Sequence, residues 1–396
     1  MTSALLPAPR LLAAPADPAP FAAYAGADGR ELFIRAVERS GLRGRGGAGF
    51  PTGRKLRAVA AAHGRCTVVV NACESEPVSH KDRTLLAQSP HLVLDGALLV
   101  AQAVRASEVV VCGHGTNPFP TVSRGHPVPV RWQTVPRRYV ASEESALVRL
   151  LATGDARPTT KPPRPVDQGV LVSNVETFAH IALIARRGPD WFRSVGTPQS
   201  PGTTLVTVSG AVRTPGVWEV ACGAPLGHAL DLAGAAPRAQ AVLVGGVAGA
   251  WLPLPLAAPV ALTSEALAAV GAPPGVGALY VLAPDVCGLA ETSRILRYLA
   301  AETAAQCGPC MFGLPSLADD LSRLAQGAVD PDLPARLRRR LVVVEGRGAC
   351  RHPDGAVRVA RSALRVFADD LQQHRTGQPC RHIGKTLLPW LTGDHR

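Results

Sequence analysis

The pattern of apolar and polar positions divides the 396-residue chain into three parts. In the first part, helical spacing over 29–40 and an apolar helical stretch over 90–105 alternate with β-branched runs at 66–70 (CTVVV) and 108–112 (EVVVC). Short strands separated by helices are typical of a parallel sheet. We therefore predict that the first part of the chain is an α/β domain.

The second part follows a turn-rich segment, 196–203 (GTPQSPGT). Short apolar runs separated by Gly and Pro fill 203–283, which predicts a small β-rich domain. Beyond 291 the spacing becomes helical. The candidate helices are 291–305, 316–326, 332–341 and 359–374, and the predicted domains are 1–195, 196–285 and 286–396.

Two local patterns refine this outline. Ser142 precedes Glu143 and Glu144, and a short polar residue before acidic residues predicts a helix N-terminus, here for a helix to about Thr153.

The uncharged stretch 241–264 is long enough to cross a bilayer. However, its prolines and glycines would break a helix, so we expect strands and turns there. With no signal-peptide pattern at Met1, we expect a soluble, cytoplasmic protein with no transmembrane segment.

Charge and cysteine content narrow the chemistry. Lys and Arg number 42 against 30 Asp and Glu, which gives a formal net charge of +12. A basic surface attracts nucleic acid, anionic lipid or an acidic protein. No basic tract is interleaved with aromatic residues, so nucleic acid is a poor partner, and an Arg-rich surface without a partner is the alternative interpretation. Nine cysteines without an export signal favour metal or redox chemistry over disulfides.

The glycine-rich segment Gly41–Lys55 (GLRGRGGAGFPTGRK) carries the strongest chemical signal. Its glycines let backbone amides approach an anion closely, as a phosphate site requires. A helix that begins near Thr52 would add its positive end, and Arg45 and Lys55 would add positive charge. We interpret this segment as a phosphate-binding loop.

The next unit, Val68–Arg83 (VVVNACESEPVSHKDR), is a strand followed by an acidic loop. Open α/β sheets bind ligands at the carboxyl ends of their strands. Asn71, Glu74 and Glu76 follow such an end, where they would hydrogen-bond a flavin edge, a ribitol or a ribose. A solvated acidic loop is the alternative interpretation.

These segments resemble the family of NADH- and FMN-binding flavoprotein subunits of respiratory complex I. The glycine loop, NACESEP with KDR, YVASEESAL (139–147), KPPRP (161–165) and SNVET (173–177) follow in that family's order. The family includes the diaphorase subunits of NAD-linked hydrogenases and formate dehydrogenases. The resemblance implies a Rossmann-like FMN-binding domain, a β-grasp (SLBB) middle domain, and a C-terminal helical bundle with a cysteine cluster.

The resemblance also implies the site residues, none of which would act as a catalytic acid or base. Those that would hold FMN are Gly44, Arg45, Gly47, Lys55, Asn71, Glu74, Ser75, Tyr139, Glu143, Glu144 and Asn174. The residues that would face the nicotinamide nucleotide are Phe50, Glu76, Glu144 and Arg164.

Several positions depart from the family pattern. Cys73 replaces the Asp of NADESEP, and Ala141 with Ser142 replaces the Cys-Gly pair of YxCGEE. Arg164 replaces the aromatic of KPPFP that is expected to stack on adenine. A guanidinium at this position would either grip a 2′-phosphate and shift the preference toward NADPH, or face solvent.

The cysteines of the last part also depart from the family. Its cluster motif, ESCGxCxPC, corresponds to 302–310, where Ala304 stands at the first ligand position and Cys307 and Cys310 remain. Cys350 matches the fourth ligand. A 4Fe–4S cluster takes four ligands, so a water molecule, His352 or Cys380 would complete the shell. The alternatives are an incomplete cluster, a zinc ion or no metal.

By this resemblance the chain is identified as a divergent member of the family. It would pass electrons through FMN between NAD(P)H and an iron–sulfur cluster or a protein acceptor, such as an acidic ferredoxin or other subunits of an oxidoreductase complex. The alternative is an electron-transfer or scaffold subunit that does not oxidise NADH, like the C subunit of Rnf-type complexes. The residues at Cys73, Ser142 and Arg164 favour that alternative.

Overall fold

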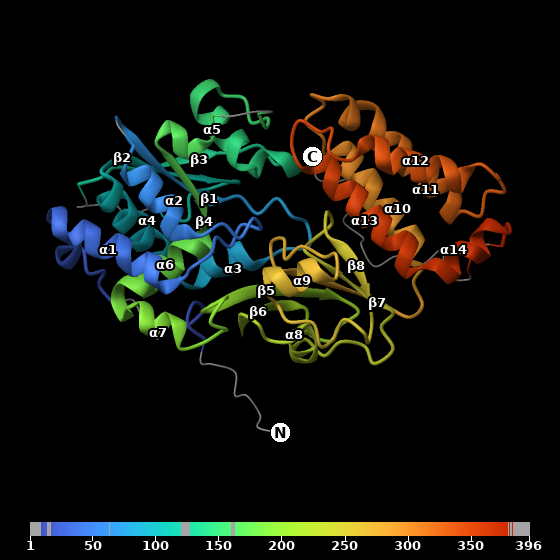
Figure 1. The fold of residues 1–396 in the computed structure, drawn as a ribbon, viewed down its shortest axis with the longest axis horizontal. Coiled ribbons are helices and arrows are strands. Elements are labelled where there is room, and N and C mark those ends of the chain that lie inside the picture. Colours follow the sequence, from blue (N-terminus) through green and yellow to red (C-terminus); the bar gives the residue numbers. More distant parts are fainter. Residues whose placement is uncertain are drawn as a thin grey trace.

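The computed structural model describes residues 9–13, 17–62, 64–119, 127–159, 163–378, 380 and 382. Figure 1 shows an α/β unit built from the first half of the chain, a smaller sheet below it, and a helical bundle at the C-terminal side. The predicted order of an α/β part, a β-rich part and a helical part is confirmed.

The first unit is built on a four-stranded parallel sheet in the order β3-β2-β1-β4. The apolar helix α4 packs on α6 and on this sheet, and their side chains form the largest core cluster. The other face of the sheet packs against α5. The strands are β1 (Cys66–Ala72), β2 (Ala106–Gly113), β3 (Val130–Thr134) and β4 (Val170–Asn174). The helices are η1 (Ala22–Tyr24), α1 (Gly26–Ser40), α2 (Thr52–Ala60), α3 (Lys81–Gln88), α4 (Pro90–Val104), η2 (Tyr139–Ser142), α5 (Glu144–Thr153), η3 (Pro165–Gln168), α6 (Val175–Arg187) and α7 (Pro189–Arg193).

The second unit is a five-stranded mixed sheet in the order β6-β5-β9-β7-β8. β5 and the central strand β9 are parallel, and the other pairs are antiparallel. The stretch 241–264 forms two of these strands with turns, as the sequence predicted. The elements are β5 (Thr203–Gly210), β6 (Gly216–Ala221), α8 (Leu226–Leu232), β7 (Ala241–Val244), β8 (Ala250–Pro253), α9 (Ser264–Ala269) and β9 (Ala278–Leu282).

The third unit is a bundle whose helices share one apolar core with the inner side of the second sheet. The candidate helix 359–374 was wrong in its limits, because two helices cover this region and the chain breaks at Phe367 (φ −106°, ψ 40°). The elements are α10 (Gly288–Ala301), the π-helical turn η4 (Pro309–Gly313), α11 (Leu314–Ala325), α12 (Leu333–Val344), α13 (His352–Val366) and α14 (Ala368–Arg375).

The start of α5 and the length of the apolar helices can also be compared with the predictions. Ser142 was predicted to cap α5, but Ser142 ends the 3-10 turn η2 and Glu143 is the N-cap, accepting hydrogen bonds from Ser145 N and Ala146 N. No single helix among the described residues is long and apolar enough to cross a membrane. By length and composition alone one bent pair passes that test, α3 with α4, which meet at 94°.

Candidate functional site

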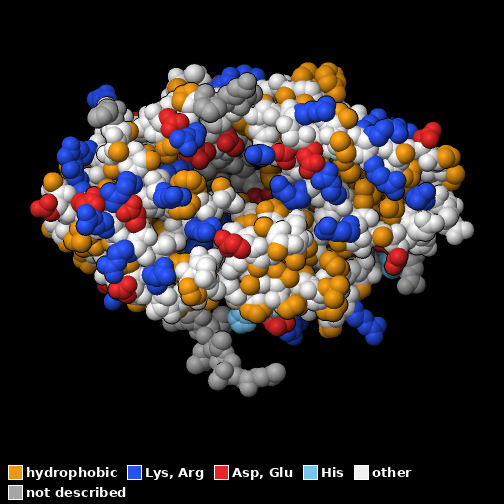
Figure 2. All heavy atoms as spheres, viewed as in Figure 1, with side chains coloured by type: hydrophobic (Ala, Val, Ile, Leu, Met, Phe, Trp, Pro, Cys, Tyr) orange, Lys and Arg blue, Asp and Glu red, His pale blue; other side chains and the backbone are white. Residues whose placement is uncertain are grey.

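A cavity of about 460 Å³ lies where the three units meet, and we call it the central cavity. Figure 2 shows a hollow near the centre of this face, between the parts that Figure 1 labels α5 and α13, with charged side chains around it. The α/β unit contributes the glycine loop and the ends of β1 and β4, the second unit contributes the turns at Gly245 and Gly275, and the bundle contributes residues 350–358. The volume is in the range of small-molecule binding sites.

The parallel sheet directs two asparagines into this cavity. Asn71 and Asn174 are register partners at the carboxyl ends of the neighbouring strands β1 and β4. The Asn71 amide donates to Ser142 O at 2.9 Å, and Asn174 caps α6 by accepting from Glu176 N at 3.1 Å. The site is therefore at the strand edge where open α/β sheets bind ligands.

The glycine loop closes one wall of the cavity. Gly44 N donates to Phe50 O at 2.9 Å, which folds the loop back on itself. Gly47 has a φ of +103°, and a Cβ there would lie 3.3 Å from the backbone of Gly275 in the second unit. A side chain at Gly47 would therefore be strained and would also push against that turn.

A smaller cavity of about 80 Å³ lies on the other side of this loop, lined in part by Gly44 and Gly47. Arg45 also lines it, and its guanidinium donates to Thr203 O at 3.0 Å and Cys222 Sγ at 3.3 Å. Its backbone amide donates to Thr177 Oγ1 at 2.9 Å, from the SNVET segment. The Arg45 side chain is thus held against the second unit.

A buried ionic network lies between the two cavities, with Asp82 and Asn174 lining the central one and Lys81 and Glu176 the smaller one. Lys81 Nζ donates to Asp82 Oδ1 at 2.6 Å and to Asn174 Oδ1 at 2.9 Å, and lies 2.9 Å from Glu176 Oε2. Arg45 lies 3.8 Å from the same glutamate, so two cations face two carboxylates. Burial raises the pKa of Asp82 to about 6 in spite of its pairing with Lys81. The sequence contains the KDR motif but does not reveal this role of its Lys and Asp, because hydropathy does not show that they are buried.

The two glutamates of the acidic loop differ in environment. Glu74 accepts from Ser79 Oγ at 2.8 Å and Asp82 N at 3.0 Å, and from the Arg83 backbone and side chain. Burial opposes its ionisation, but these donors hold the pKa of Glu74 below its usual value. Glu76 accepts from Tyr139 Oη and from Val247 N, each at 3.0 Å, and its burial raises its pKa to about 7.

Other predicted residues line the central cavity from neighbouring loops. Tyr139 contacts the bundle, with its ring 5.5 Å from that of His352, and burial raises its pKa well above its usual value. The Ser75 hydroxyl is 3.2 Å from His114 Nε2. Glu143 lines the cavity as well, although its carboxylate caps α5. These side chains belong to two segments that are far apart in the chain, and the fold brings them together.

Four further predicted residues line neither of these two cavities. Lys55 Nζ donates to Glu144 Oε1 and to Val172 O, both at 2.7 Å, so these two predicted residues pair with each other. Phe50 is half-exposed at 51%. The Arg164 side chain is 70% exposed and pairs with Asp167, and Lys161 and Pro162 of the same KPPRP segment lie outside the described residues. The predicted roles of Lys55 and Glu144 in FMN binding, and of Phe50, Glu144 and Arg164 in nicotinamide-nucleotide binding, stay predictions.

One residue of the predicted cysteine trio lies in the opposite wall. Cys307 precedes η4, Cys310 lies within it, and Cys350 precedes α13 and lines the central cavity. Burial, with a smaller effect of the neighbouring thiols of Cys307 and Cys350, raises the pKa of Cys310 to about 12, so the three thiols share one neighbourhood. Ala304 contributes no ligand atom.

The two residues considered for the fourth ligand have different surroundings. His352 lines the central cavity, and its Nε2 lies 2.7 Å from Leu299 O, while its buried Nδ1 has no hydrogen-bond partner within the described part of the chain. Cys380 instead lies beside Cys287 and His374. Of the two, His352 is the one placed beside Cys350.

The residues present fit an FMN and three of the four ligands of a cluster. For FMN, the cavity has the required size, a glycine wall that a Cβ would obstruct, and amide and carboxylate side chains at two strand ends. For a cluster, thiols are the correct donors, and His352 Nδ1 is a buried acceptor next to them in sequence.

Comparison with known proteins agrees with this geometry. Residues 37–183 match the family model of the Nuo51 FMN-binding domain, and residues 290–374 match that of the NADH-ubiquinone oxidoreductase-F iron-sulfur binding region. The F subunit of the NADH-quinone oxidoreductase of Streptomyces coelicolor is 30% identical over 377 residues, which cover 88% of this chain and 84% of that protein. An F subunit of the corresponding enzyme of Rhizobium meliloti is 29% identical, with 88% and 90% covered.

A solved structure of a related protein has a similar fold. A chain of the NAD+-reducing NiFe-hydrogenase in the H2-reduced state superposes with a TM-score of 0.81 at 30% identity over 89% of this chain. The match covers 64% of that chain, so the protein spans less than two thirds of its length.

Proposed function

Because the chain belongs to the family of NADH-quinone oxidoreductase F subunits, we propose that it is an FMN-bearing, NAD(P)H-oxidising component of a larger redox complex. The observation that carries this proposal is the central cavity, which has the glycine loop and two strand ends on one wall and Cys350 on the other. An electron carrier bound there would lie between the two strand ends and the Cys350 thiol.

Several residues in and next to the cavity have a definable task in this proposal. FMN, when bound, would accept electrons as a pair and release them singly. Gly46, Gly47 and Ala48 would allow close approach of the backbone, Asn71 and Asn174 would orient the ring by their amides, and Cys307, Cys310 and Cys350 would hold an iron–sulfur cluster. Glu76 and Tyr139 would shape the space for the nucleotide.

The finer architecture belongs to the same proposal. Residues 1–195 would be the FMN-binding domain, 196–285 a β-grasp (SLBB) domain and 286–396 the cluster-binding bundle. The mixed five-stranded sheet with α8 against β5 and β6 supports the middle assignment, and the clustering of Cys307 and Cys310 in the bundle supports the last.

The bundle also offers a docking surface for an acidic electron carrier or another protein of the complex. Next to Cys310, Met311 and Phe312 are 51% and 69% exposed, and on α12 Val342 and Val343 are exposed beside Arg338 and Arg339. An apolar centre with basic neighbours is suited to a partner that has a negative rim. The net charge of +12 acts in the same direction.

The test is reduction of bound flavin. Protein purified anaerobically with added FMN should show a flavin spectrum that NADH or NADPH bleaches. Gly46→Ala adds a methyl group to the wall of the central cavity. The methyl would lie 3.4 Å from Asn174 Cβ and Gly46 has no positive φ, so the variant should fold. Because the methyl occupies space beside the cofactor, FMN binding should weaken. Gly216→Ala, where a Cβ has open space, is the matched control. Absence of flavin in wild type would contradict the proposal.

A second candidate is a flavoprotein or scaffold component that does not oxidise NADH. The specific observations that favour it are the exposed Arg164 in its pair with Asp167 and the Lys55–Glu144 pair, because predicted nucleotide and flavin ligands are engaged elsewhere. Bound flavin that neither NADH nor NADPH reduces, but that dithionite does, would support this candidate.

A further inference from the structure

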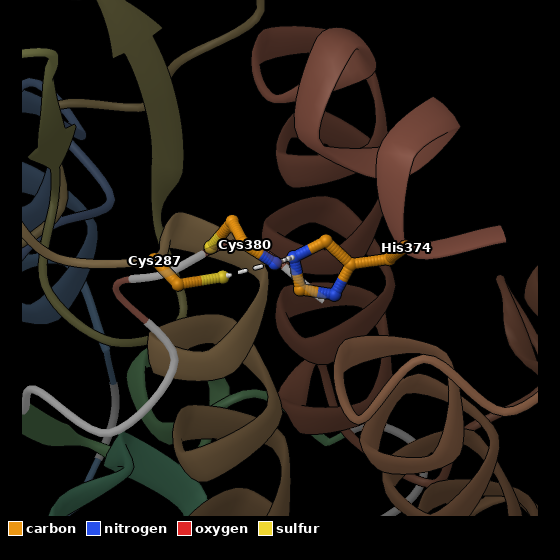
Figure 3. A group of neighbouring side chains, drawn as sticks. All are labelled: Cys287, His374 and Cys380. Carbon is orange, nitrogen blue, oxygen red and sulfur yellow. Dashed lines mark hydrogen bonds between the residues drawn. The ribbon is translucent and has the colours of Figure 1, made fainter. Parts of the chain in front are cut away.

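Three metal-ligating side chains gather away from the central cavity. Cys287, His374 and Cys380 are buried, and their ligand atoms all lie within 4.8 Å of one another. Figure 3 shows Cys287 and Cys380 on one side of the imidazole ring of His374. These three side chains are therefore close enough to one another to hold a single ion.

The imidazole is oriented as metal-binding histidines are. His374 Nδ1 lies 2.7 Å from Ala325 O at the end of α11, and a carbonyl can only accept, so Nδ1 carries the proton. The backbone N–H of Cys380 donates to Nε2 at 3.0 Å, which requires the same tautomer. A carbonyl that fixes one nitrogen, with the lone pair of the other directed to thiols, is the usual outer-shell arrangement of a metal-bound histidine.

The distances between the ligand atoms are close to those around a bound zinc ion. Cys287 Sγ lies 3.7 Å from His374 Nε2. A tetrahedral zinc, with bonds of about 2.3 Å to sulfur and about 2.0 Å to nitrogen, places such atoms roughly 3.5 Å apart. Two thiolates and a neutral imidazole would also cancel the charge of Zn²⁺, so that a buried site holds no net charge. Two cysteines that simply filled the core would not need this convergence.

We propose that Cys287, His374 and Cys380 bind a structural zinc ion that joins the two ends of the helical bundle. Cys287 is the N-cap of α10, the first helix of the bundle, whereas His374 lies in α14 and Cys380 follows it. Binding would release one proton from each thiol, and the Nε2 lone pair would turn from the Cys380 amide to the ion. That amide would then donate to a thiolate sulfur, as Ala290 N already does to Cys287 Sγ at 3.4 Å. A water molecule would take the fourth position.

The site is separate from the flavin and cluster chemistry, so its test does not depend on the proposed function. Zinc and iron are measured on the full chain purified anaerobically, and on Cys287→Ser, His374→Ala and Cys380→Ser. Wild type should retain about one zinc per chain, and each variant should lose it. Cys66→Ser, at a buried cysteine of the α/β unit, and Cys310→Ser should both keep the zinc.

Cobalt provides a second readout that does not need the variants to be stable. Chelator-treated wild type titrated with Co²⁺ should develop the strong visible bands of a tetrahedral thiolate complex, and Zn²⁺ should bleach them. Zinc should also raise the midpoint of thermal unfolding of wild type and of Cys310→Ser. A Cys287–Cys380 disulfide in the anaerobic protein, zinc lost only with Cys310→Ser, or no metal with free thiols would each overturn the proposal.

Discussion

The Glu76 side chain is confined by its neighbours at the level of single atoms. A Cβ on Gly246 would lie 2.3 Å from its Oε2, so the carboxylate packs directly on a glycine of the second unit. Tyr139 Oη and Val247 N donate to the carboxylate, and both donors are uncharged. Burial therefore raises the pKa of Glu76 to about 7, against about 4.3 for a free glutamate.

This pKa predicts a pH dependence of stability. Between roughly pH 4.3 and 7 the folded chain holds a proton on Glu76 that the unfolded chain has released, so the free energy of unfolding falls as pH rises through this window. Glu76→Gln cannot titrate. As pH rises across the window, its free energy of unfolding should therefore increase relative to that of wild type by on the order of 3 kcal/mol. Thermal unfolding at several pH values measures this, with the exposed Glu265→Gln as control. Parallel curves for wild type and Glu76→Gln would contradict the assignment.

A second prediction concerns the missing thiol. Ala304→Cys would supply the fourth sulfur that a 4Fe–4S cluster requires. We expect iron and sulfide to rise to roughly four each per chain, with a reduced-state EPR signal. Ala335→Cys, on the exposed side of α12, adds a thiol elsewhere and should leave the iron content unchanged. Equal iron in both variants would show that the position of the thiol does not matter and would contradict a cluster at the trio.

The sequence predicted which residues converge but not how their side chains are used. Asn71 and Asn174 follow strand ends, so parallel pairing was enough to place them together. The exclusion of Lys55 and Glu144 from the cavity depends on a pair between helices far apart in sequence, which local pattern does not show. The Cys287–His374–Cys380 group was missed for the same reason, because its members carry no spacing motif.

At the scale of elements, most limits follow from local sequence, and the errors have local causes. Helix α2 begins at Thr52 as expected after the glycine loop. The predicted helix 359–374 ran through Phe367, because apolar spacing continues across the break, whereas the Phe367 ring packs 5.4 Å from Trp251 in the second unit. That tertiary contact is not visible in the periodicity of the helix.

The cap of α5 gives a prediction at this scale. Glu143 Oε2 accepts from Ser145 N at 2.9 Å and Ala146 N at 3.2 Å, and also from the Ser145 hydroxyl. Glu143→Ala should lower the free energy of unfolding by about 1 kcal/mol, whereas Glu143→Asp, a stronger N-cap type, should not. Denaturant unfolding without FMN separates this effect from any role in cofactor binding. If the Ala and Asp variants are equally stable, the cap does not stabilise the helix.

At the scale of the whole molecule, the site exists only because three units close on it. Gly47 lies against Gly275, Val247 N donates to Glu76, and Tyr139 N donates to Glu302 Oε2 at 2.8 Å, so the α/β unit contacts both of the other units beside the cavity. The sequence predicted the order of the units, since each has its own periodicity. It did not predict how they pack, because those contacts join residues far apart in the chain and depend on small or buried polar groups.

The charge of the molecule gives the last prediction. If Arg338 and Arg339 steer an acidic carrier to the exposed surface beside Cys310, then Arg338→Glu with Arg339→Glu should slow NADH-driven reduction of an acidic ferredoxin about tenfold at low salt. Arg54→Glu with Arg65→Glu lowers the net charge equally, but on exposed arginines of the α/β unit, and should have a much smaller effect. Salt screens such forces over about 10 Å at 0.1 M, so the difference between the two double variants should disappear as salt increases. Equal slowing in both would show that net charge alone, and not this surface, guides the partner.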